Sequence, residues 1–122
     1  MSDPDLSSFL PELDRFLRAR REELPEGSYT TRLLTEPTFV QRKIMEEAFE
    51  VCLELQAAEV DPGNAAEEAA DLVFHLMAAL IGAGVSWAEV EAVLRDRHSR
   101  PARHSTYGEH SASAGSEGEG KS

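Results

Sequence analysis

The chain has 122 residues and a formal net charge of −11, enough length for one domain that buries roughly two-thirds of its unfolded surface. The charge argues against a nucleic-acid-binding protein and against docking on an anionic membrane, because both need clustered Lys and Arg. The single cysteine, Cys52, excludes a disulfide framework and a thiolate zinc site. No secretory leader and no apolar run of ~18 residues is visible, so we expect a cytoplasmic protein.

Two helices separated by a loop are expected in the first half of the chain. Apolar residues recur at helical spacing over residues 6–20, which predicts the first helix. Residues 26–37, EGSYTTRLLTEP, contain turn-forming residues and are expected to form a loop. A second helix is predicted from Pro37 to Val60, because proline suits the first turn of a helix and the DPGN sequence at 61–64 is a stop-and-turn signal.

A third helix is expected to follow this turn. Asn64, with Glu67 three residues later, has the pattern of a helix-starting cap. The helix is predicted to extend to about Gly82, with Gly84 as a left-handed terminator.

A short fourth helix is predicted after an S-x-x-E capping box formed by Ser86 and Glu89. Its inner side is expected to carry Trp87, Val90, Val93 and Leu94. Residues 98–122 contain almost no large apolar side chain and are predicted to be a disordered polar tail, which leaves residues 1–97 as the domain. The predicted fold class is all-α, a four-helix-type bundle.

Apolar residues cover more than half of the circumference of the helix predicted from Pro37 to Val60. Such a helix needs packing on two sides, from other helices of the chain or from a second subunit. A homodimer is therefore expected, because a monomer would expose a large apolar patch. Cys52 lies on the apolar side and is expected to be a small buried hydrophobe.

Acidic residues are concentrated between residues 44 and 76, which contain nine Asp and Glu side chains and no Lys or Arg. A charged strip on a helix is usually a solvated face, but such faces normally mix Glu with Lys at i,i+4. If the two helices here face each other, their carboxylates must be protonated or share a cation. Carboxylate oxygens suit Mg²⁺ or Mn²⁺, and such a site accepts a polyphosphate. This pattern favours an enzyme that acts on nucleotides.

Two acidic motifs carry a resemblance to a known family. E-E-x-x-E at residues 46–50 is followed after seventeen residues by E-x-x-D at 68–71. Together with GSYT at 27–30, KIMEEAFEV at 43–51 and EEAADLVFHL at 67–76, these motifs resemble the all-α, MazG-like nucleotide pyrophosphohydrolases. Within that superfamily the chain is most similar to the phosphoribosyl-ATP pyrophosphohydrolases of histidine biosynthesis, over about residues 6–97.

The resemblance implies Mg²⁺-dependent hydrolysis of 1-(5-phosphoribosyl)-ATP to the AMP form and pyrophosphate, by a homodimer. The implied metal ligands are Glu47, Glu50, Glu68 and Asp71. The implied catalytic residues are Glu46 and Glu47, with Glu46 binding a further ion or orienting the attacking water. The candidates for substrate binding are Ser28, Tyr29, Thr30, Arg32, Lys43 and His75.

Two of these candidates have alternative readings that the sequence leaves open. Lys43 either touches a phosphate oxygen or forms an ion pair with Glu47, one turn away. His75, one turn after Asp71, either supports the site from behind a metal ligand or is a satisfied polar residue of the bundle.

Two other functions compete with this one. The same carboxylates would serve a house-cleaning hydrolase of triphosphates such as dUTP or dCTP, because they act on the phosphates alone. A non-enzymatic acidic helical module for assembly is the third hypothesis.

No cyclohydrolase segment precedes the domain, so the next step of the pathway is expected to need another polypeptide.

Overall fold

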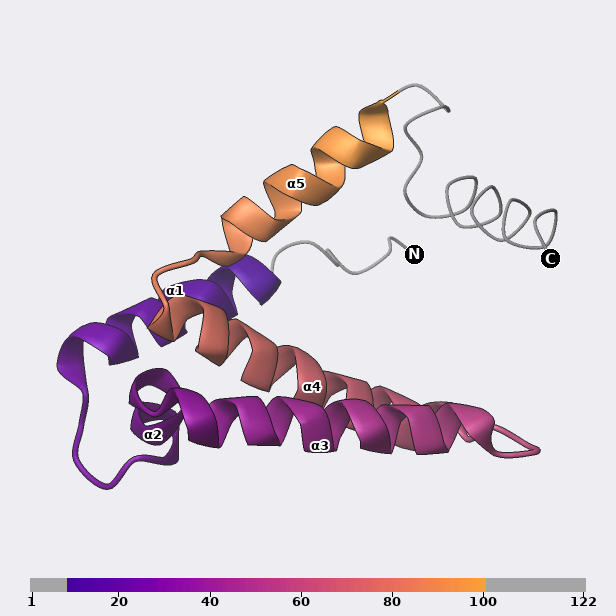
Figure 1. The fold of residues 1–122 in the computed structure, drawn as a ribbon. Coiled ribbons are helices and arrows are strands. Elements are labelled where there is room, and N and C mark those ends of the chain that lie inside the picture. The colour runs from indigo at the N-terminus through magenta and orange to yellow at the C-terminus, as the bar shows by residue number, and fades with distance from the viewer. Residues whose placement is uncertain (1–8, 101–122) are drawn as a thin grey trace, which may run out of the picture. The chain divides into compact units, whose positions relative to one another are not determined.

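A computed structural model describes residues 9–100, which contain five α-helices and no strand (Figure 1). The predicted all-α fold class is confirmed. The helices are α1 (Phe9–Glu23), α2 (Tyr29–Thr35), α3 (Pro37–Gln56), α4 (Pro62–Gly82) and α5 (Trp87–Ser99). Helices α1 to α4 and Trp87 belong to one compact unit, and residues 88–100 belong to a second.

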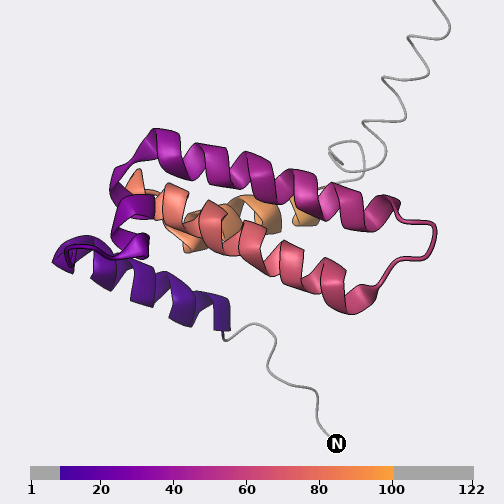
Figure 2. The same ribbon diagram turned by 90° about the horizontal axis from the view of Figure 1, so that it is seen from below.

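Helices α3 and α4 lie side by side and antiparallel, joined by a short connection (Figures 1 and 2). The connection differs from the expected one, because α3 ends at Gln56 and α4 begins at Pro62. The cap is Asp61 rather than the predicted Asn64: its carboxylate accepts hydrogen bonds from the N–H groups of Gly63 (2.9 Å) and Asn64 (3.2 Å). An Asp cap directly before a proline satisfies the first free N–H groups of a helix, so α4 starts earlier than expected.

The segment expected to be a loop contains the short helix α2. The Ser28 side chain caps this helix and accepts a hydrogen bond from the Thr31 N–H at 3.3 Å. Leu33 and Leu34 are both buried, and α2 contacts α1, α3 and α4. The loop prediction was wrong because Gly27, with φ of +76°, ends the preceding turn and leaves the residues after it free to form a helix.

The core lies at one end of the α3–α4 pair, where α1 and α2 pack against it. Helix α3 buries only Val40, near its start, whereas α4 buries residues between 75 and 81, near its end. The buried apolar residues are Leu17, Leu33, Leu34, Val40, Met77, Ala78 and Ile81. Burial therefore decreases along both helices toward the residue 57–61 connection.

One side of α3 stays exposed in the single chain, although two-sided packing was expected. Met45 is 70% exposed and Phe49 is 61% exposed. Cys52, three residues after Phe49, is also exposed, so the prediction that it is buried is wrong for the single chain. The reason is that α4 covers only one side of α3, and Cys52 lies outside the covered side.

Helix α5 begins at Trp87, directly after Ser86, in agreement with the predicted start. It contains no buried residue, and the predicted inner positions Val93 and Leu94 are each about half exposed, at 48% and 49%. These two side chains are thus not buried within their own unit, whereas Trp87, which belongs to the first unit, packs against the core as expected. The helix continues to Ser99, two residues past the predicted domain boundary, and the rest of the predicted tail, 101–122, lies outside the described residues.

Gly82 lies where the end of α4 passes close to α2. A Cβ atom at this position would lie 2.5 Å from the Leu34 carbonyl oxygen, which belongs to the backbone and has little freedom to move. We expect Gly82→Ala to destabilise the protein by roughly 1–3 kcal/mol in urea unfolding, despite the usual benefit of alanine in helices. Gly63→Ala is the control, because there the nearest atom is a side-chain oxygen at 3.3 Å. Equal stability of Gly82→Ala and the wild type would contradict this packing.

Candidate functional site

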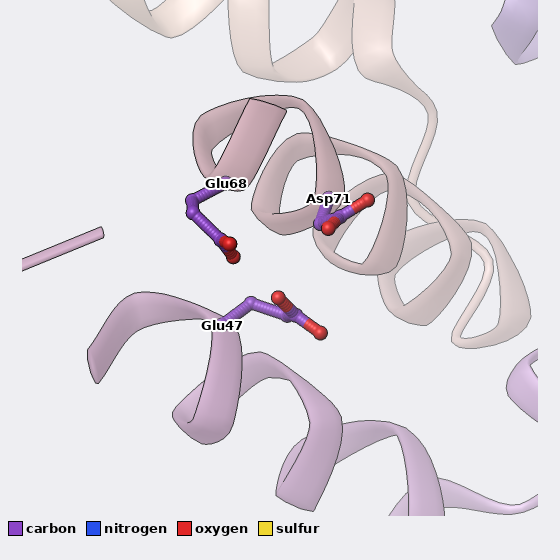
Figure 3. Close-up of side chains that lie close together, drawn as sticks. All are labelled: Glu47, Glu68 and Asp71. Atoms are coloured by element: carbon purple, nitrogen blue, oxygen red, sulfur yellow. The ribbon is translucent and has the colours of Figure 1, made fainter. Parts of the chain in front are cut away.

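Three carboxylates from α3 and α4 converge at one place (Figure 3). One oxygen from each of Glu47, Glu68 and Asp71 lies within 4.8 Å of the others. Glu47 belongs to α3, and Glu68 and Asp71 are one turn apart on α4. Glu47 and Glu68 are partly buried and Asp71 is exposed. The antiparallel pairing of the two helices thus brings together three of the four predicted metal ligands, whereas the fourth, Glu50, is exposed and does not belong to this group. We call these three residues the carboxylate cluster.

The carboxylate cluster lies beside the edge of the core. Ile44, one turn before Glu47, and Phe74, one turn after Asp71, both pack against the buried residues. Their packing fixes how far α3 and α4 can separate and which faces of the two helices meet. Apolar contacts therefore hold the carboxylates near one another despite their mutual repulsion.

The surroundings of Glu68 raise its pKa above the usual value of 4.5. Desolvation is the largest cause, followed by the negative charges of Glu50, Asp71, Glu47 and Glu54 in that order. Among residues 9–100, no Lys, Arg or His forms an ion pair with any of these five carboxylates. The site is therefore an excess of negative charge, and the cation whose charge reaches it, Lys43 near Glu47, forms its ion pair with Glu46 instead.

The donor set suits a hard divalent cation. All of the ligand atoms in the cluster are carboxylate oxygens, with no thiolate or imidazole among them. Oxygen ligands of one Mg²⁺ lie about 3 Å apart when adjacent and about 4.2 Å apart when opposite, given bonds near 2.1 Å. The present separations of up to 4.8 Å are larger than those of adjacent ligands, so the three side chains would have to move inward to share one ion.

The raised pKa of Glu68 predicts how stability depends on pH without metal. The folded state binds this proton more tightly than the unfolded state, so unfolding free energy falls as pH rises from about 4.5 through the raised value. Glu68→Gln should remove this part of the decrease, and the melting temperature of EDTA-treated protein between pH 4 and 8 measures it. Glu12→Gln on α1 is the control. An unchanged slope in Glu68→Gln would contradict the crowding of carboxylates.

Lys43 and Glu46 form an ion pair. The Lys43 Nζ atom lies 3.2 Å from a Glu46 carboxylate oxygen, and this hydrogen bond is the main reason that the pKa of Lys43 is raised. The predicted alternative of an ion pair with Glu47 is thus replaced by a pair with Glu46. Glu46 is not one of the three carboxylates of the cluster, and 53% of its side chain is exposed.

Among the α2 candidates, the structure connects only Tyr29 to the site. The Tyr29 hydroxyl lies 2.7 Å from Nε2 of His75, which is 6% exposed. Nδ1 of His75 lies 2.7 Å from the Asp71 backbone carbonyl oxygen. Ser28 caps α2, and the Arg32 guanidinium lies over the Phe39 ring and pairs with Glu36. Thr30, which directly follows Tyr29 in α2, is partly buried.

Glu54 was not among the predicted site residues, yet its charge reaches Glu68. A signal for it was present in the sequence. Glu54 follows Glu47 by seven residues and Glu50 by four, so all three lie on one face of α3. The E-E-x-x-E motif ends before this position, and the resemblance therefore did not include it.

A comparison with protein families gives a match to the region that contains the carboxylate cluster. The Phosphoribosyl-ATP pyrophosphohydrolase family matches residues 10–98. The chain belongs to this family. The match covers α3 and α4 entirely and includes every residue of the carboxylate cluster. The family assignment that the two acidic motifs suggested is confirmed.

Several phosphoribosyl-ATP pyrophosphatases match the chain over most of their own length. The protein of that name from Leptospira biflexa is 39% identical over 92 residues, which are 75% of this chain and 98% of the relative. The one from Ignicoccus hospitalis is 40% identical over 94 residues, 75% of this chain and 89% of the relative. No solved structure matches the chain significantly.

Other relatives of this pyrophosphohydrolase family are much longer. The histidine biosynthesis trifunctional protein of Neurospora crassa is 41% identical over 85 residues, 70% of this chain but 9% of the relative. The histidine biosynthesis bifunctional protein HisIE of Parasynechococcus marenigrum is 40% identical over 94 residues, 76% of this chain and 41% of the relative. The chain thus spans less than half of these multifunctional relatives. None of the five helices in residues 9–100, taken alone, combines the length and the hydropathy of a membrane span.

Proposed function

We propose that this chain hydrolyses 1-(5-phosphoribosyl)-ATP to 1-(5-phosphoribosyl)-AMP and pyrophosphate in histidine biosynthesis, with Mg²⁺ as cofactor and Mn²⁺ as a substitute. The observation that carries the proposal is the convergence of Glu47, Glu68 and Asp71, none of which forms an ion pair with a cationic side chain within residues 9–100. Family membership and the names of the full-length relatives support the choice of substrate.

The proposed roles follow from the positions of the carboxylates. Glu47, Glu68 and Asp71 hold the cation, and Glu50 adds the charge that strengthens its binding. When bound, the cation neutralises charge on the phosphate oxygens and lowers the pKa of a bound water. Water adds to the α-phosphorus, the bond to the bridging oxygen of the β-phosphate breaks, and pyrophosphate leaves. Glu46 stays the candidate for orienting that water.

The remaining predicted roles concern the substrate end. Lys43 lies on the face of α3 next to the cluster. We propose that its Nζ atom leaves the Glu46 carboxylate and donates to a phosphate oxygen when the substrate binds. Ser28, Thr30 and Arg32 lie on or next to α2 and stay predictions as ribose-phosphate contacts. In the structure Ser28 caps α2 and Arg32 pairs with Glu36. The cytoplasmic location also stays a prediction.

A direct comparison of substrates tests the proposed function. Purified protein with Mg²⁺ is given phosphoribosyl-ATP, dUTP or dCTP, and pyrophosphate release is measured at equal concentrations. We expect kcat/KM for phosphoribosyl-ATP to exceed the others by at least a hundredfold. Preference for either plain triphosphate would instead support a house-cleaning hydrolase, and no turnover of any of the three would contradict a pyrophosphohydrolase.

We further propose that the protein is a homodimer through the exposed side of α3. Met45, Phe49 and Cys52 follow one another at helical spacing on this side and are all exposed in the single chain. Phe49→Glu should halve the mass measured by analytical ultracentrifugation, because burying a charge without a partner disfavours association. Ala19→Glu on α1 adds the same charge elsewhere and should leave the mass unchanged. A monomeric wild type at micromolar concentration would contradict the dimer.

A further inference from the structure

A hydrogen-bonded path connects α2 to the metal-binding turn of α4. It runs from the Tyr29 hydroxyl to Nε2 of His75, and from Nδ1 of His75 to the backbone carbonyl of Asp71, with both separations 2.7 Å. The imidazole that joins the two ends is 6% exposed. A buried ring with both nitrogens bonded has one orientation available to it.

The chemistry of the partners determines which atom donates and which accepts in each hydrogen bond of the path. A carbonyl oxygen only accepts hydrogen bonds, so Nδ1 of His75 carries a proton and donates it to Asp71. In the neutral ring Nε2 is then the acceptor, and the Tyr29 O–H donates to it. The phenol hydrogen is therefore committed to His75 and is not available to a phosphate oxygen of the nucleotide.

Aromatic contacts hold the two side chains in this arrangement. The Tyr29 ring meets the rings of Phe39 and His75 edge to face, with centroids 5.8 Å and 5.9 Å apart. Phe74 meets His75 in the same way at 5.5 Å. Tyr29 is itself 47% exposed, so these contacts hold only one side of its ring against His75, and through His75 they link it to the α4 turn between residues 71 and 75.

We propose that Tyr29 is a positioning residue that acts on the metal ligand Asp71 through His75, and that it does not bind the nucleotide by donating to it. This inference rests on the proposed function, because it requires Asp71 to hold a cation. The His75 ring pins the carbonyl of the residue whose carboxylate joins the cluster. Groups that orient a metal ligand from behind typically contribute 10- to 100-fold in metal affinity.

Tyr29→Phe is the sharpest variant, because it keeps the ring and removes only the hydroxyl. Thr31→Val is the matched control: it removes another α2 hydroxyl, which donates to the Pro25 carbonyl at 2.8 Å and has no link to His75. Mg²⁺ binding is titrated calorimetrically for both variants and the wild type without substrate. We expect at least tenfold weaker binding in Tyr29→Phe and unchanged binding in Thr31→Val.

Two further readouts separate positioning from a contact with substrate. Nitrogen NMR of the wild type should show neutral His75 with its proton on Nδ1. At saturating Mg²⁺, Tyr29→Phe should recover kcat and keep the wild-type KM for phosphoribosyl-ATP. A KM that stays raised under these conditions, equal Mg²⁺ affinity in Tyr29→Phe and the wild type, or His75 protonated on both nitrogens would each overturn the inference. A wild type that binds no Mg²⁺ would contradict the proposed function itself.

Discussion

Replacing Asp71 with Asn should lower turnover of phosphoribosyl-ATP about a thousandfold at a Mg²⁺ concentration that saturates the wild type. The carboxylate is one of three that converge within 4.8 Å, and an amide of the same shape has no negative charge to hold a divalent cation. Lewis-acid stabilisation of the phosphate oxygens is worth several kcal/mol, and each 1.36 kcal/mol corresponds to a factor of ten in rate. Pyrophosphate release measures the loss.

The same substitution separates an enzyme from an acidic assembly module. In both cases, removing one charge from the cluster should stabilise the metal-free protein, so a higher melting temperature alone decides nothing. Only the enzyme loses turnover. Glu22→Gln, an exposed substitution on α1, is the control and should keep wild-type activity. Turnover of Asp71→Asn within tenfold of the wild type would mean that Asp71 does not hold the catalytic cation.

Mg²⁺ should stabilise the folded protein strongly. A ligand at one hundred times its Kd adds about 2.7 kcal/mol to the free energy of unfolding when it binds only the folded state. For a folded region of this size that corresponds to a rise in melting temperature of roughly 10–20 °C. Differential scanning calorimetry with increasing MgCl₂, at constant ionic strength, measures the rise.

Variants of the proposed metal ligands should be more stable than the wild type without metal and should be stabilised less by Mg²⁺. Glu47→Gln and Asp71→Asn are expected to start at a higher melting temperature than the wild type in EDTA and to gain little from Mg²⁺. The Glu22→Gln control should gain as much as the wild type. If NaCl at matched ionic strength reproduced the Mg²⁺ effect, charge screening rather than a specific site would explain it.

The long helices and the pairing of the acidic motifs were predictable from the sequence. Helical spacing of apolar residues is a strong signal over twenty residues, and the antiparallel connection between α3 and α4 follows from their short linker. The pairing of Glu47 with Glu68 and Asp71 then required only that the acidic faces meet.

Short-range features were predicted less well, and for physical reasons. Helix α2 has seven residues and is stabilised by the burial of Leu33 and Leu34, which local turn signals do not reveal. Asp61 and Asn64 are both good caps, and only the structure shows that the helix starts at the first of them.

Burial of single residues depended on which side of a helix is covered. Cys52 lies on an apolar surface that extends over more than half of α3, and the pattern does not tell which part α4 covers. The partner of Lys43 was similarly undetermined, because Glu46 at i+3 and Glu47 at i+4 are both within reach on a helix. The structure resolves this choice in favour of Glu46.

Carboxylates of α3 and α4 are proposed to share one divalent cation. Crystals grown with Mn²⁺ and measured near the manganese absorption edge test it directly, because the anomalous signal locates the ion independently of the protein atoms. We predict a peak about 2.1–2.3 Å from oxygens of Glu47, Glu68 and Asp71. Density for three ordered carboxylates with no anomalous peak among them, at a Mn²⁺ concentration that supports turnover, would contradict a shared cation site.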